Sequence, residues 1–347
     1  MKKFLLLALI SMFAIVAAAC SSDKDSSSGS SDGEKDTSSD KPIIIKFSHV
    51  TAIDSVKGKA ADRFAELVAE KTDGKAKVEV YPSSQLYGDA DELDALVSGN
   101  VHMIAPSVTK MVKLDPRWQY VDMPFLFENQ EHAHKFFESD VAQTILNSDQ
   151  LKNNDIMGLA FWENGFKHFS NNKHEMKAPE DLKGLKFRAQ AGKVLESQFN
   201  ALKAGSATIS FGETYAALQQ GTVDGQENTF NNFDTQKYSE VQKYLTVSEH
   251  GRLDYGIFVN KTFWEGMPED IRAQVEEALK EATELEWQLA NDENEASFEN
   301  IKNSGKVEVT ELTEEERQKF VDALQPVYDE FSDDITPELL DGIRDLK

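Results

Sequence analysis

The sequence predicts an α/β fold in two lobes that a long helix connects. Segments typical of strands and of helices alternate along the first half of the chain, which is the pattern of a largely parallel sheet. The same alternation returns after residue 155. A chain of 347 residues is long enough for two lobes, each with a substantial core.

The predicted elements follow from apolar periodicity and from the glycine and proline residues that bound each segment. In the first half we expect a strand at 42–50, a helix at 56–74, a strand at 75–82, a short helix at 89–99 and a strand at 101–107. In the second half we expect strands at 155–162, 185–190, 207–210, 222–228 and 255–261, with helices at 193–202 and 212–221.

The long helix is predicted from Pro268 to about Asn303, because this stretch contains no internal glycine or proline and has apolar residues at helical spacing. Pro268 with the acidic residues after it makes a favourable first turn. At 1.5 Å per residue, about 36 residues would extend roughly 50 Å, which exceeds one small lobe. The alternative is two helices with an unmarked break.

The N-terminus predicts export from the cytoplasm. Residues 1–19 combine two lysines, an apolar run and small residues, which is the pattern of a signal peptide. The only cysteine, Cys20, follows directly and resembles the lipidated cysteine of a bacterial lipobox, although Ala17 stands where leucine is usual. Residues 20–41 have the composition of a disordered tether. The alternative is an ordinary signal peptide with an incidental cysteine.

The charge and the motifs narrow the function. A formal net charge of −24 argues against nucleic acid as a partner and would repel small anions, so an anion site must supply its own local cations. We find no catalytic signature such as G-x-S-x-G, and the HEMKA stretch at 174–178 lacks the second histidine of a zinc motif. The acidic stretch 88–94 lacks the glycine and terminal glutamate of a calcium loop, and we expect a solvated helix start there. The sequence implies no metal and no cofactor.

Several stretches, taken in order, resemble one family. They are IKFSHV (45–50), YPSSQLYGD (81–89), WENGFKHFSN (162–171), APEDLKGLKFRAQ (178–190), ISFGETYAALQQGTVDGQEN (209–228) and KYSEVQKYLTVSEHG (237–251). The resemblance is to the DctP-type solute-binding proteins of tripartite ATP-independent periplasmic (TRAP) transporters, and it covers roughly residues 43–340. It implies a periplasmic-binding-protein-like fold with a ligand cleft between the lobes and one long helix that spans both.

The resemblance also implies ligand-binding residues. The arginine of LKGLKFR, Arg188, corresponds to the residue that grips a substrate carboxylate, and a guanidinium matches a carboxylate with two parallel hydrogen bonds. Asn228 would hydrogen-bond the same carboxylate, and Phe211 would pack on the ligand. The alternative for Arg188 is a structural ion pair with Asp181 or Glu213. Asn228 could instead be a turn residue, and Phe211 a core residue.

Specificity is predicted to depend on a second group of residues. Lysine at 167 resembles the branch of the family that binds C4-dicarboxylates, and Lys57 would add a cation from the other lobe. Asp89 matches a lining position in some relatives, but we leave it out because a carboxylate would repel a dicarboxylate. His49 and Ser107 end strands at positions where relatives line the cleft, and Trp162 and Asn164 would shape the cleft wall. The alternative for His49 is a structural role, which is more common for a lone histidine after a strand.

Together these observations predict an extracytoplasmic, membrane-anchored lipoprotein. We place lobe 1 at 43–164 plus about 253–293, and lobe 2 at 165–252 plus about 294–347. The expected function is capture of succinate, fumarate or malate for delivery to a TRAP permease, without catalysis. The alternatives are binding of another organic acid such as a uronate, gluconate or a 2-oxo acid, presentation of ligand to a receptor kinase, and a secreted lipoprotein hydrolase.

Overall fold

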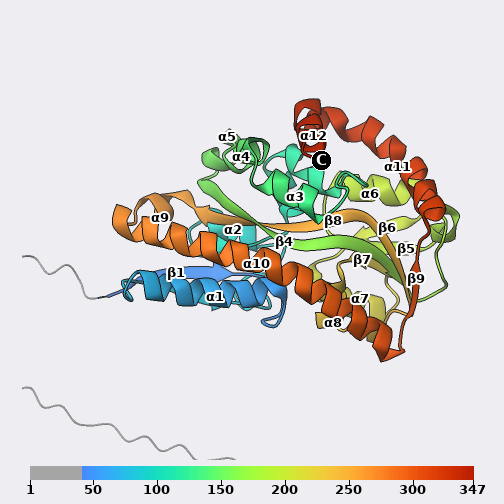
Figure 1. Ribbon diagram of the computed structural model, residues 1–347, viewed down its shortest axis with the longest axis horizontal. Helices are drawn as coiled ribbons and strands as arrows, with labels where there is room; N and C mark the ends of the chain where they lie inside the picture. The colour runs from blue at the N-terminus through green and yellow to red at the C-terminus, as the bar shows by residue number, and fades with distance from the viewer. Residues whose placement is uncertain (1–40) are drawn as a thin grey trace, which may run out of the picture. The chain divides into compact units, whose positions relative to one another are not determined.

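One mixed sheet of nine strands runs through residues 41–347, the part of the chain that the computed structural model describes (Figure 1). The strand order is β2-β1-β3-β8-β4-β7-β5-β6, and β9 pairs with β8. The predicted signal peptide (1–19), the lipidated Cys20 and the tether up to residue 40 lie outside the described residues. No helix within residues 41–347 combines the length and the apolarity needed to cross a lipid bilayer.

Two groups of parallel strands form the two ends of the sheet. In each group the central strand pairs in parallel with both of its flanking strands, so each predicted lobe has its own parallel unit. The first group consists of β1 (Ile43–Ser48), β2 (Ala76–Tyr81) and β3 (Met103–Ile104), and the second of β5 (Lys186–Ala189), β6 (Gly205–Thr208) and β7 (Gly225–Asn228). This confirms the predicted α/β class.

Two long strands join these groups. β4 (Ile156–Asn171) and β8 (Tyr244–Asn260) pair antiparallel along almost their whole lengths, and β9 (Glu308–Glu311) adds to β8 in parallel. The prediction ended the first of these strands at 162 and began the second at 255, and both boundaries were wrong. The register of the pair shifts at three points, and such bulges break the simple alternation by which strands are recognised.

The long helix is continuous. α10 (Glu269–Ser304) has 36 residues, with Pro268 at its start and Gly305 in the left-handed conformation at its end. It contacts α1 (Val56–Lys71) at one end and α8 (Phe230–Thr235) at the other, and it crosses β4 between them (Figure 1). The predicted single helix is therefore confirmed, and the alternative of two helices is wrong.

The other helices cover the faces of the sheet. Those between residues 108 and 153, and the two at the C-terminus, have no counterpart among the predicted elements. By contrast, α2 (Glu92–Val97), α6 (Lys193–Ala201) and α7 (Phe211–Gln219) correspond to predicted helices. The remaining helices are α3 (Gln130–Phe137), α4 (Asp140–Leu146), α5 (Asp149–Asn153), α9 (Lys261–Glu265), α11 (Glu314–Ile335) and α12 (Pro337–Arg344), with short 3₁₀ helices η1 (Val108–Lys113), η2 (Pro116–Asp122), η3 (Pro179–Leu182) and η4 (Tyr238–Glu240).

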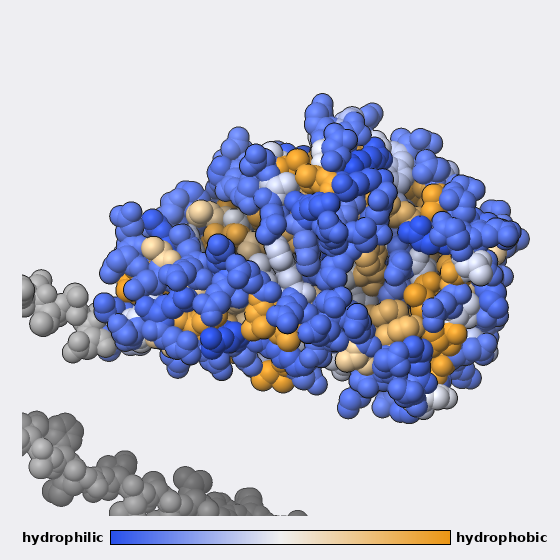
Figure 2. Space-filling view, in the orientation of Figure 1, coloured by the Kyte–Doolittle hydropathy of each residue, from blue (hydrophilic) through white to orange (hydrophobic). Residues whose placement is uncertain are grey.

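The hydrophobic core is divided, but not at the predicted lobe boundaries. One cluster joins β1, α1 and the first half of α10 within lobe 1. A second cluster joins residues 93–151 to α6, α11 and α12, so the C-terminal helices contact parts of both predicted lobes. Hydrophilic residues cover most of the face in Figure 2, and hydrophobic residues gather there only in small areas. The proposed lobe boundaries stay a prediction.

Candidate functional site

Four predicted site residues lie at or just beyond the carboxyl ends of the parallel strands of the two lobes. β1 leads to His49 and β3 leads to Ser107, while Arg188 lies near the end of β5 and Asn228 ends β7. In open α/β sheets, ligands bind beyond the carboxyl ends of strands. The predicted residues from distant parts of the sequence are therefore placed around one central region.

Arg188 is fully buried, and two of its three guanidinium nitrogens make no hydrogen bond within residues 41–347. Its Nε donates to the carbonyl oxygen of Ile209 at 2.9 Å, whereas Nη1 and Nη2 have no hydrogen-bond partner among residues 41–347. Burial lowers the pKa of Arg188, although the residue stays charged. The alternative partners are engaged elsewhere, since Asp181 accepts from the backbone of Lys177 and Glu213 from Ser210. A buried fork of two free N–H groups fits a carboxylate ligand.

Asn228 ends β7, the strand that pairs with the strand of Arg188, and protein contacts orient its amide. Its Oδ1 accepts hydrogen bonds from the backbone of Thr229 at 3.1 Å and from Asn232 Nδ2 at 2.9 Å. Its Nδ2 is buried and finds no acceptor within the described chain, so the free side of the amide is its donor. Phe211, at the start of α7, is 6% exposed. A donor amide and an apolar ring suit the carboxylate and the carbon chain of an organic acid.

Lobe 1 contributes a second buried cation, Lys57 on α1. Its Nζ donates to the carbonyl oxygen of Ala105 at 2.7 Å and lies 3.6 Å from the centre of the Tyr255 ring. No carboxylate lies within 4 Å of it among the described residues. Burial lowers the pKa of Lys57 to about 8. Lys57 is therefore a cation without a protein counter-ion in contact, as a dicarboxylate site requires.

His49 and Ser107 add polar atoms from the strand ends of lobe 1. The Nδ1 of His49 lies 3.2 Å from Thr51 Oγ1, and its Nε2 is buried without a partner in the part of the chain that the structure covers. Burial lowers the pKa of His49 to about 3, so the imidazole is neutral at neutral pH. Ser107 pairs with Tyr255 through the backbone, and its buried hydroxyl likewise has no protein partner.

Lys167 differs from Lys57 because protein carboxylates surround it. Its Nζ lies 2.6 Å from Glu227 Oε1 and 3.2 Å from Asp122 Oδ1, and all three side chains are buried. Glu227 also contacts His250 Nε2 at 2.8 Å and accepts from Gln198 Nε2 at 2.8 Å. Despite burial, these carboxylates raise the pKa of Lys167. The structure thus places Lys167 in an ion-pair network, and the prediction that it contacts ligand stays a prediction.

Trp162 and Asn164 lie where β4 crosses between the predicted lobes. Trp162 is fully buried in the lobe 1 core, and its Nε1 donates to Thr283 Oγ1 at 2.9 Å. Asn164 donates to Tyr255 Oη and accepts from Thr229 Oγ1 at 2.6 Å, and so ties residues of both lobes together. The hydrogen-bonding groups of both side chains are thus held by protein, which fits shaping of the site better than direct contact with ligand.

Three charged residues near the site were not among the predicted ligand-binding residues: Lys110 and Glu92 were missed, and Asp89 was left out. Asp89 accepts a hydrogen bond from the backbone nitrogen of Phe211 at 2.6 Å and lies 3.5 Å from Lys110 Nζ, so two groups compensate the carboxylate that we had expected to repel a ligand. Lys110 also donates to the carbonyl oxygen of Gln190 at 3.2 Å. Glu92 is buried and the Asp89 side chain is only 8% exposed, whereas Asp91 and Asp94 are exposed, so the expected solvated helix start is wrong for Glu92. Lys110 follows a predicted strand closely, and that signal could have identified it.

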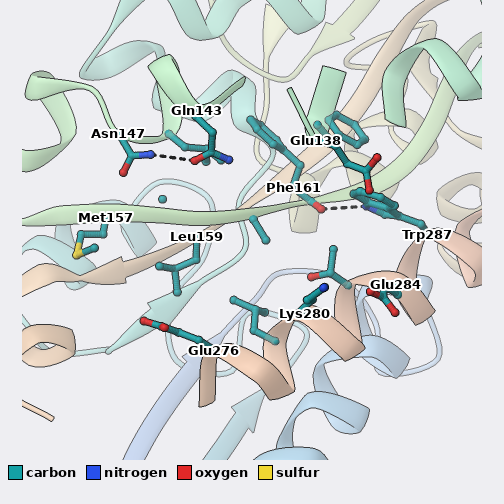
Figure 3. A pocket seen from close by; sticks show the side chains of 16 residues that line it. Glu138, Gln143, Asn147, Met157, Leu159, Phe161, Glu276, Lys280, Glu284 and Trp287 are labelled. Atoms are coloured by element: carbon teal, nitrogen blue, oxygen red, sulfur yellow. Dashed lines mark hydrogen bonds between the residues drawn. The ribbon is translucent and has the colours of Figure 1, made fainter. Parts of the chain in front are cut away.

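An open pocket on the surface has different chemistry. It has a volume of about 400 Å³ between α4, β4 and α10, and Leu159 and Trp287 form part of its apolar wall (Figure 3). Three glutamates and a single lysine supply its charged side chains: Glu138, Glu276, Glu284 and Lys280. This excess of negative charge would repel an organic dianion. The pocket is therefore a poor candidate for the same ligand.

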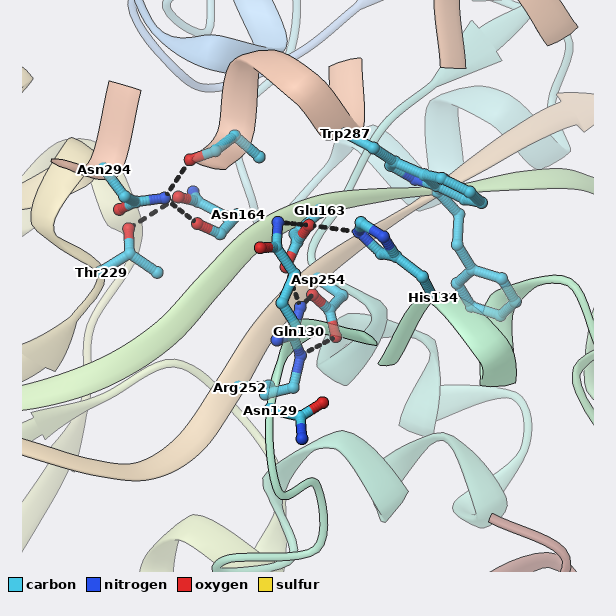
Figure 4. A network of polar contacts seen from close by, with 12 residues as sticks. Asn129, Gln130, His134, Glu163, Asn164, Thr229, Arg252, Asp254, Trp287 and Asn294 are labelled. Atoms are coloured by element: carbon cyan, nitrogen blue, oxygen red, sulfur yellow. Dashed lines mark hydrogen bonds and ion pairs between the residues drawn. The ribbon is translucent and has the colours of Figure 1, made fainter. Parts of the chain in front are cut away.

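A network of paired charges lies in the middle of the β4–β8 pair (Figure 4). Arg252 contacts Glu163 at 2.6 Å and Asp254 at 2.8 Å, and Glu163 also lies 2.6 Å from His134 Nε2. The backbone nitrogen of Glu163 donates to Glu286 on α10 at 2.8 Å. Burial would raise the pKa of Glu163, but Arg252 and the hydrogen bonds lower it to about 2. The three elements that connect the lobes are thus fixed to one another here.

The fold and the buried, cation-lined site have the features of a solute-binding protein. Residues 47–334 match the family described as "Bacterial extracellular solute-binding protein, family 7". The chain is 45% identical over 304 residues to the C4-dicarboxylate-binding periplasmic protein DctP of Rhodobacter capsulatus, covering 87% of this chain and 90% of that protein. The chain therefore belongs to this family, the DctP-type solute-binding proteins of TRAP transporters, which act outside the cytoplasm.

Two solved structures are similar along most of the chain. A TRAP solute-binding protein from Shewanella oneidensis with bound succinate has a TM-score of 0.86 and 37% identity, covering 88% of this chain and 99% of that one. The sugar acid-binding protein of Advenella mimigardefordensis, in complex with galactonate, has a TM-score of 0.85 and 31% identity, covering 88% and 98%. These likenesses confirm the two-lobed fold with its long helix.

Proposed function

We propose that this protein binds a C4-dicarboxylate such as succinate, fumarate or malate between its lobes and delivers it to a TRAP permease. The observation that carries the proposal is the guanidinium of Arg188, which is buried with Nη1 and Nη2 free of any partner among the described residues. The similarity to a C4-dicarboxylate-binding protein and to a succinate-bound structure supports this choice of ligand.

The two ends of the ligand have different partners in this proposal. Arg188 and the donor amide of Asn228 hold one carboxylate from lobe 2, and Phe211 packs on the carbon chain. Lys57 binds the other carboxylate from lobe 1, together with two uncharged groups at the strand ends, Ser107 and His49. A ligand with two carboxylates can contact both lobes at once and thereby favour their closed arrangement.

The energetics of such a site are reasonable. A micromolar dissociation constant requires about 8 kcal/mol of binding free energy. Hydrogen bonds to charged groups contribute about 1.5–3 kcal/mol each, and a few of them suffice after the cost of ordering the ligand and the lobes. Because Arg188, Lys57 and His49 are inaccessible to solvent in the observed arrangement, the ligand must enter a more open form.

Lys167 has a less direct role than Lys57. Its contacts with Glu227 and Asp122 leave its charge compensated, so we propose that it positions β4 against β7 and acts on specificity through them. Replacement Lys167→Arg tests this role, since a bulkier guanidinium must displace one of the two carboxylates. A changed order of preference among organic acids would support a role of Lys167 in specificity. An unchanged order would contradict that role.

The location and the partners complete the proposal. We infer that the exported chain is anchored to the membrane through a lipidated Cys20, with residues 21–41 as a tether to the cleft-bearing domain. The proposed partner is the membrane-embedded permease of a TRAP transporter, and no catalytic step is involved. Mass spectrometry of the membrane fraction tests the anchor: a mature N-terminus that retains an unmodified signal sequence, or a free thiol at Cys20, contradicts it.

The second candidate function is binding of a sugar acid. It is favoured by the 31% identical galactonate-binding protein, whose structure is as similar in TM-score as the succinate-bound one. A sugar acid has one carboxylate and needs hydroxyl-binding groups at its other end, where this chain has the cation Lys57. For this reason we place it second.

A thermal-shift screen of the purified protein tests the proposal. The set would contain succinate, fumarate, malate, galactonate, glucuronate, gluconate, sialic acid and pyruvate. A ligand at 100 times its dissociation constant should add about 2.7 kcal/mol to the free energy of unfolding. Stabilisation by C4-dicarboxylates alone is the expected result. Stabilisation only by sugar acids would contradict the choice of a C4-dicarboxylate and favour the second candidate function. Turnover of a model ester would support the hydrolase alternative.

A further inference from the structure

Glu92, the first residue of α2, is a buried carboxyl group without a hydrogen-bond partner in residues 41–347. It is 1% exposed, and neither Oε1 nor Oε2 has a partner among the residues described. Polar groups in protein interiors are almost always hydrogen-bonded, so such a group requires an explanation. The absence of an ion pair within 4 Å, again among these residues, means that Glu92 is not the direct counter-ion of a nearby lysine.

The charges around Glu92 belong to the proposed ligand site. Asp89 precedes it on the same segment, Lys57 faces it from α1, and Lys110 faces it from η1. β8, which also contacts α2, contributes Tyr255, whose ring lies against Lys57. The carboxylate of Asp89 is held by the backbone of Phe211 and by Lys110, and it is therefore not free to move toward a ligand.

The protonation state of Glu92 follows from its surroundings. Burial raises the pKa of Glu92 to about 8, and the nearby charge of Asp89 acts in the same direction, while Lys57 and Lys110 act against them. Glu92 is therefore mostly neutral at neutral pH. This difference matters chemically, because a neutral carboxyl group can donate a hydrogen bond, whereas a carboxylate can only accept one.

The charge balance of the site also favours a neutral Glu92. The three cations Arg188, Lys57 and Lys110 lie near Asp89, which offsets one of their charges. Two other carboxyl groups lie near them: Glu227, whose charge Lys167 compensates, and Glu286, whose pKa burial raises well above its ordinary value. Two positive charges therefore remain for a ligand. A dicarboxylate dianion balances this charge when Glu92 is neutral. An ionised Glu92 would leave the filled site with one excess negative charge in a buried place, which is unfavourable.

We propose that the neutral carboxyl group of Glu92 donates a hydrogen bond to the ligand carboxylate that Lys57 binds, and that ionisation of Glu92 at alkaline pH weakens binding. This inference rests on the proposed function, because it assigns a donor to the lobe 1 end of a dicarboxylate. Glu92 is then a specificity-determining residue: it favours a second carboxylate at this end of the site and ties the affinity for that carboxylate to the proton concentration.

Titration calorimetry with succinate tests the proposal at pH 6.5 and at pH 9, in two buffers of different ionisation enthalpy at each pH. Both ligand carboxyl groups are ionised throughout this range, so their titration does not interfere. The variants are Glu92→Gln, which keeps a neutral donor, Glu92→Leu, which removes the donor, and Asp94→Asn, a control that removes an exposed carboxyl group from the same helix. Thermal unfolding without ligand confirms that each variant folds.

The expected results are distinct for each variant. At pH 6.5, Glu92→Gln should bind within about threefold of the wild type, and Glu92→Leu should bind at least about tenfold more weakly. At pH 9 the wild type should lose about tenfold in affinity relative to Glu92→Gln, because Glu92 must be protonated first. Succinate binding by the wild type at pH 9 should also take up more protons than binding by Glu92→Gln, and Asp94→Asn should match the wild type throughout.

Three results would overturn the inference. A ratio of wild-type to Glu92→Gln affinity that is equal at both pH values shows that Glu92 does not titrate with binding, although the proposed function stands. Wild-type binding at pH 9 without proton uptake has the same meaning, and it needs no variant to fold. If the wild type binds neither succinate nor fumarate nor malate at either pH, the proposed function is overturned, and this inference with it.

Discussion

Two buried arginines in this protein have opposite surroundings. Arg252, in the middle of β8, contacts the carboxylates of Glu163 and Asp254. Arg188, at the end of β5, is held only by one backbone carbonyl oxygen, and both of its terminal nitrogens are free of partners in the described chain. One terminal nitrogen of Arg252, Nη1, also lacks a partner, but its charge is compensated.

The difference separates structural charge from functional charge. A buried ion pair offsets the loss of hydration within the protein itself, and removal of one partner leaves an uncompensated charge. A buried cation without a counter-ion lowers stability until an anion arrives, and that anion is the ligand in our proposal. The same contrast holds for the lysines, since Lys167 contacts two carboxylates and Lys57 contacts none within the described residues.

The largest effect on stability is expected for Arg252→Met. The substitution removes the arginine that pairs with the buried carboxylates of Glu163 and Asp254, which should lower the free energy of unfolding by about 3–5 kcal/mol. Chemical denaturation of the purified variant measures this loss. Arg272→Met, which changes a partly exposed arginine on α10, is the control. Near-wild-type stability of Arg252→Met would contradict the structural role of the paired network.

Arg188→Ala should have the opposite profile. Loss of the ligand-binding guanidinium should cost about 2–5 kcal/mol of binding free energy, while stability without ligand stays the same or rises. Calorimetry with succinate and thermal unfolding without it provide the two measurements. Arg188→Lys, which keeps the charge but loses the two-pronged geometry, should bind with intermediate affinity. If Arg188→Ala binds succinate as the wild type does, Arg188 is not at the ligand.

The substitution Lys57→Met tests whether the unpaired lysine of lobe 1 binds the second carboxylate of the ligand. Because Lys57 has no carboxylate in contact, its removal should leave stability nearly unchanged, but it should weaken dicarboxylate binding by about 1.5–3 kcal/mol. A monocarboxylate that reaches only Arg188 should lose much less. Lys59→Met, two residues along the same helix and partly exposed, is the control. An equal loss for both kinds of ligand would remove Lys57 from the second carboxylate.

The smallest effect is the acid sensitivity of the paired network. The pKa of Glu163 is about 2 in the folded protein and therefore lies below that of an unfolded glutamate. Its contribution to stability is present above the unfolded pKa and is lost as pH falls toward 2. Between pH 5 and pH 3 the wild type should lose about 2 kcal/mol more than Glu163→Gln. Parallel unfolding curves for the two proteins across this range would contradict the assignment.

Much of the fold could be predicted because local sequence patterns indicate its helices and strands. The parallel units and the 36-residue helix have clear periodicity and clear boundaries. The continuity of β4 and β8 could not be predicted, because bulges interrupt their alternation. One bulge contains Gly165, with a φ of 116° that only glycine adopts readily.

The candidate site was predictable in part, for a related reason. The family resemblance placed Arg188 and Asn228, but no sequence pattern indicates whether a buried charge has a partner. The sequence alone does not show that Lys167 is paired with carboxylates and Lys57 is not, because this depends on their neighbours in space. Glu92 was missed because an acidic helix start is usually solvated, and its burial depends on the contacts of distant segments.

A crystal structure of the protein grown with succinate tests the central claim most directly. Our account predicts one ligand carboxylate within hydrogen-bond distance of both terminal nitrogens of Arg188 and of Asn228 Nδ2, and the other near Lys57. The contacts of Arg252 with Glu163 and Asp254 should be unchanged. Succinate bound elsewhere, for example in the open pocket of Figure 3, or a terminal nitrogen of Arg188 paired with a protein carboxylate, would contradict it.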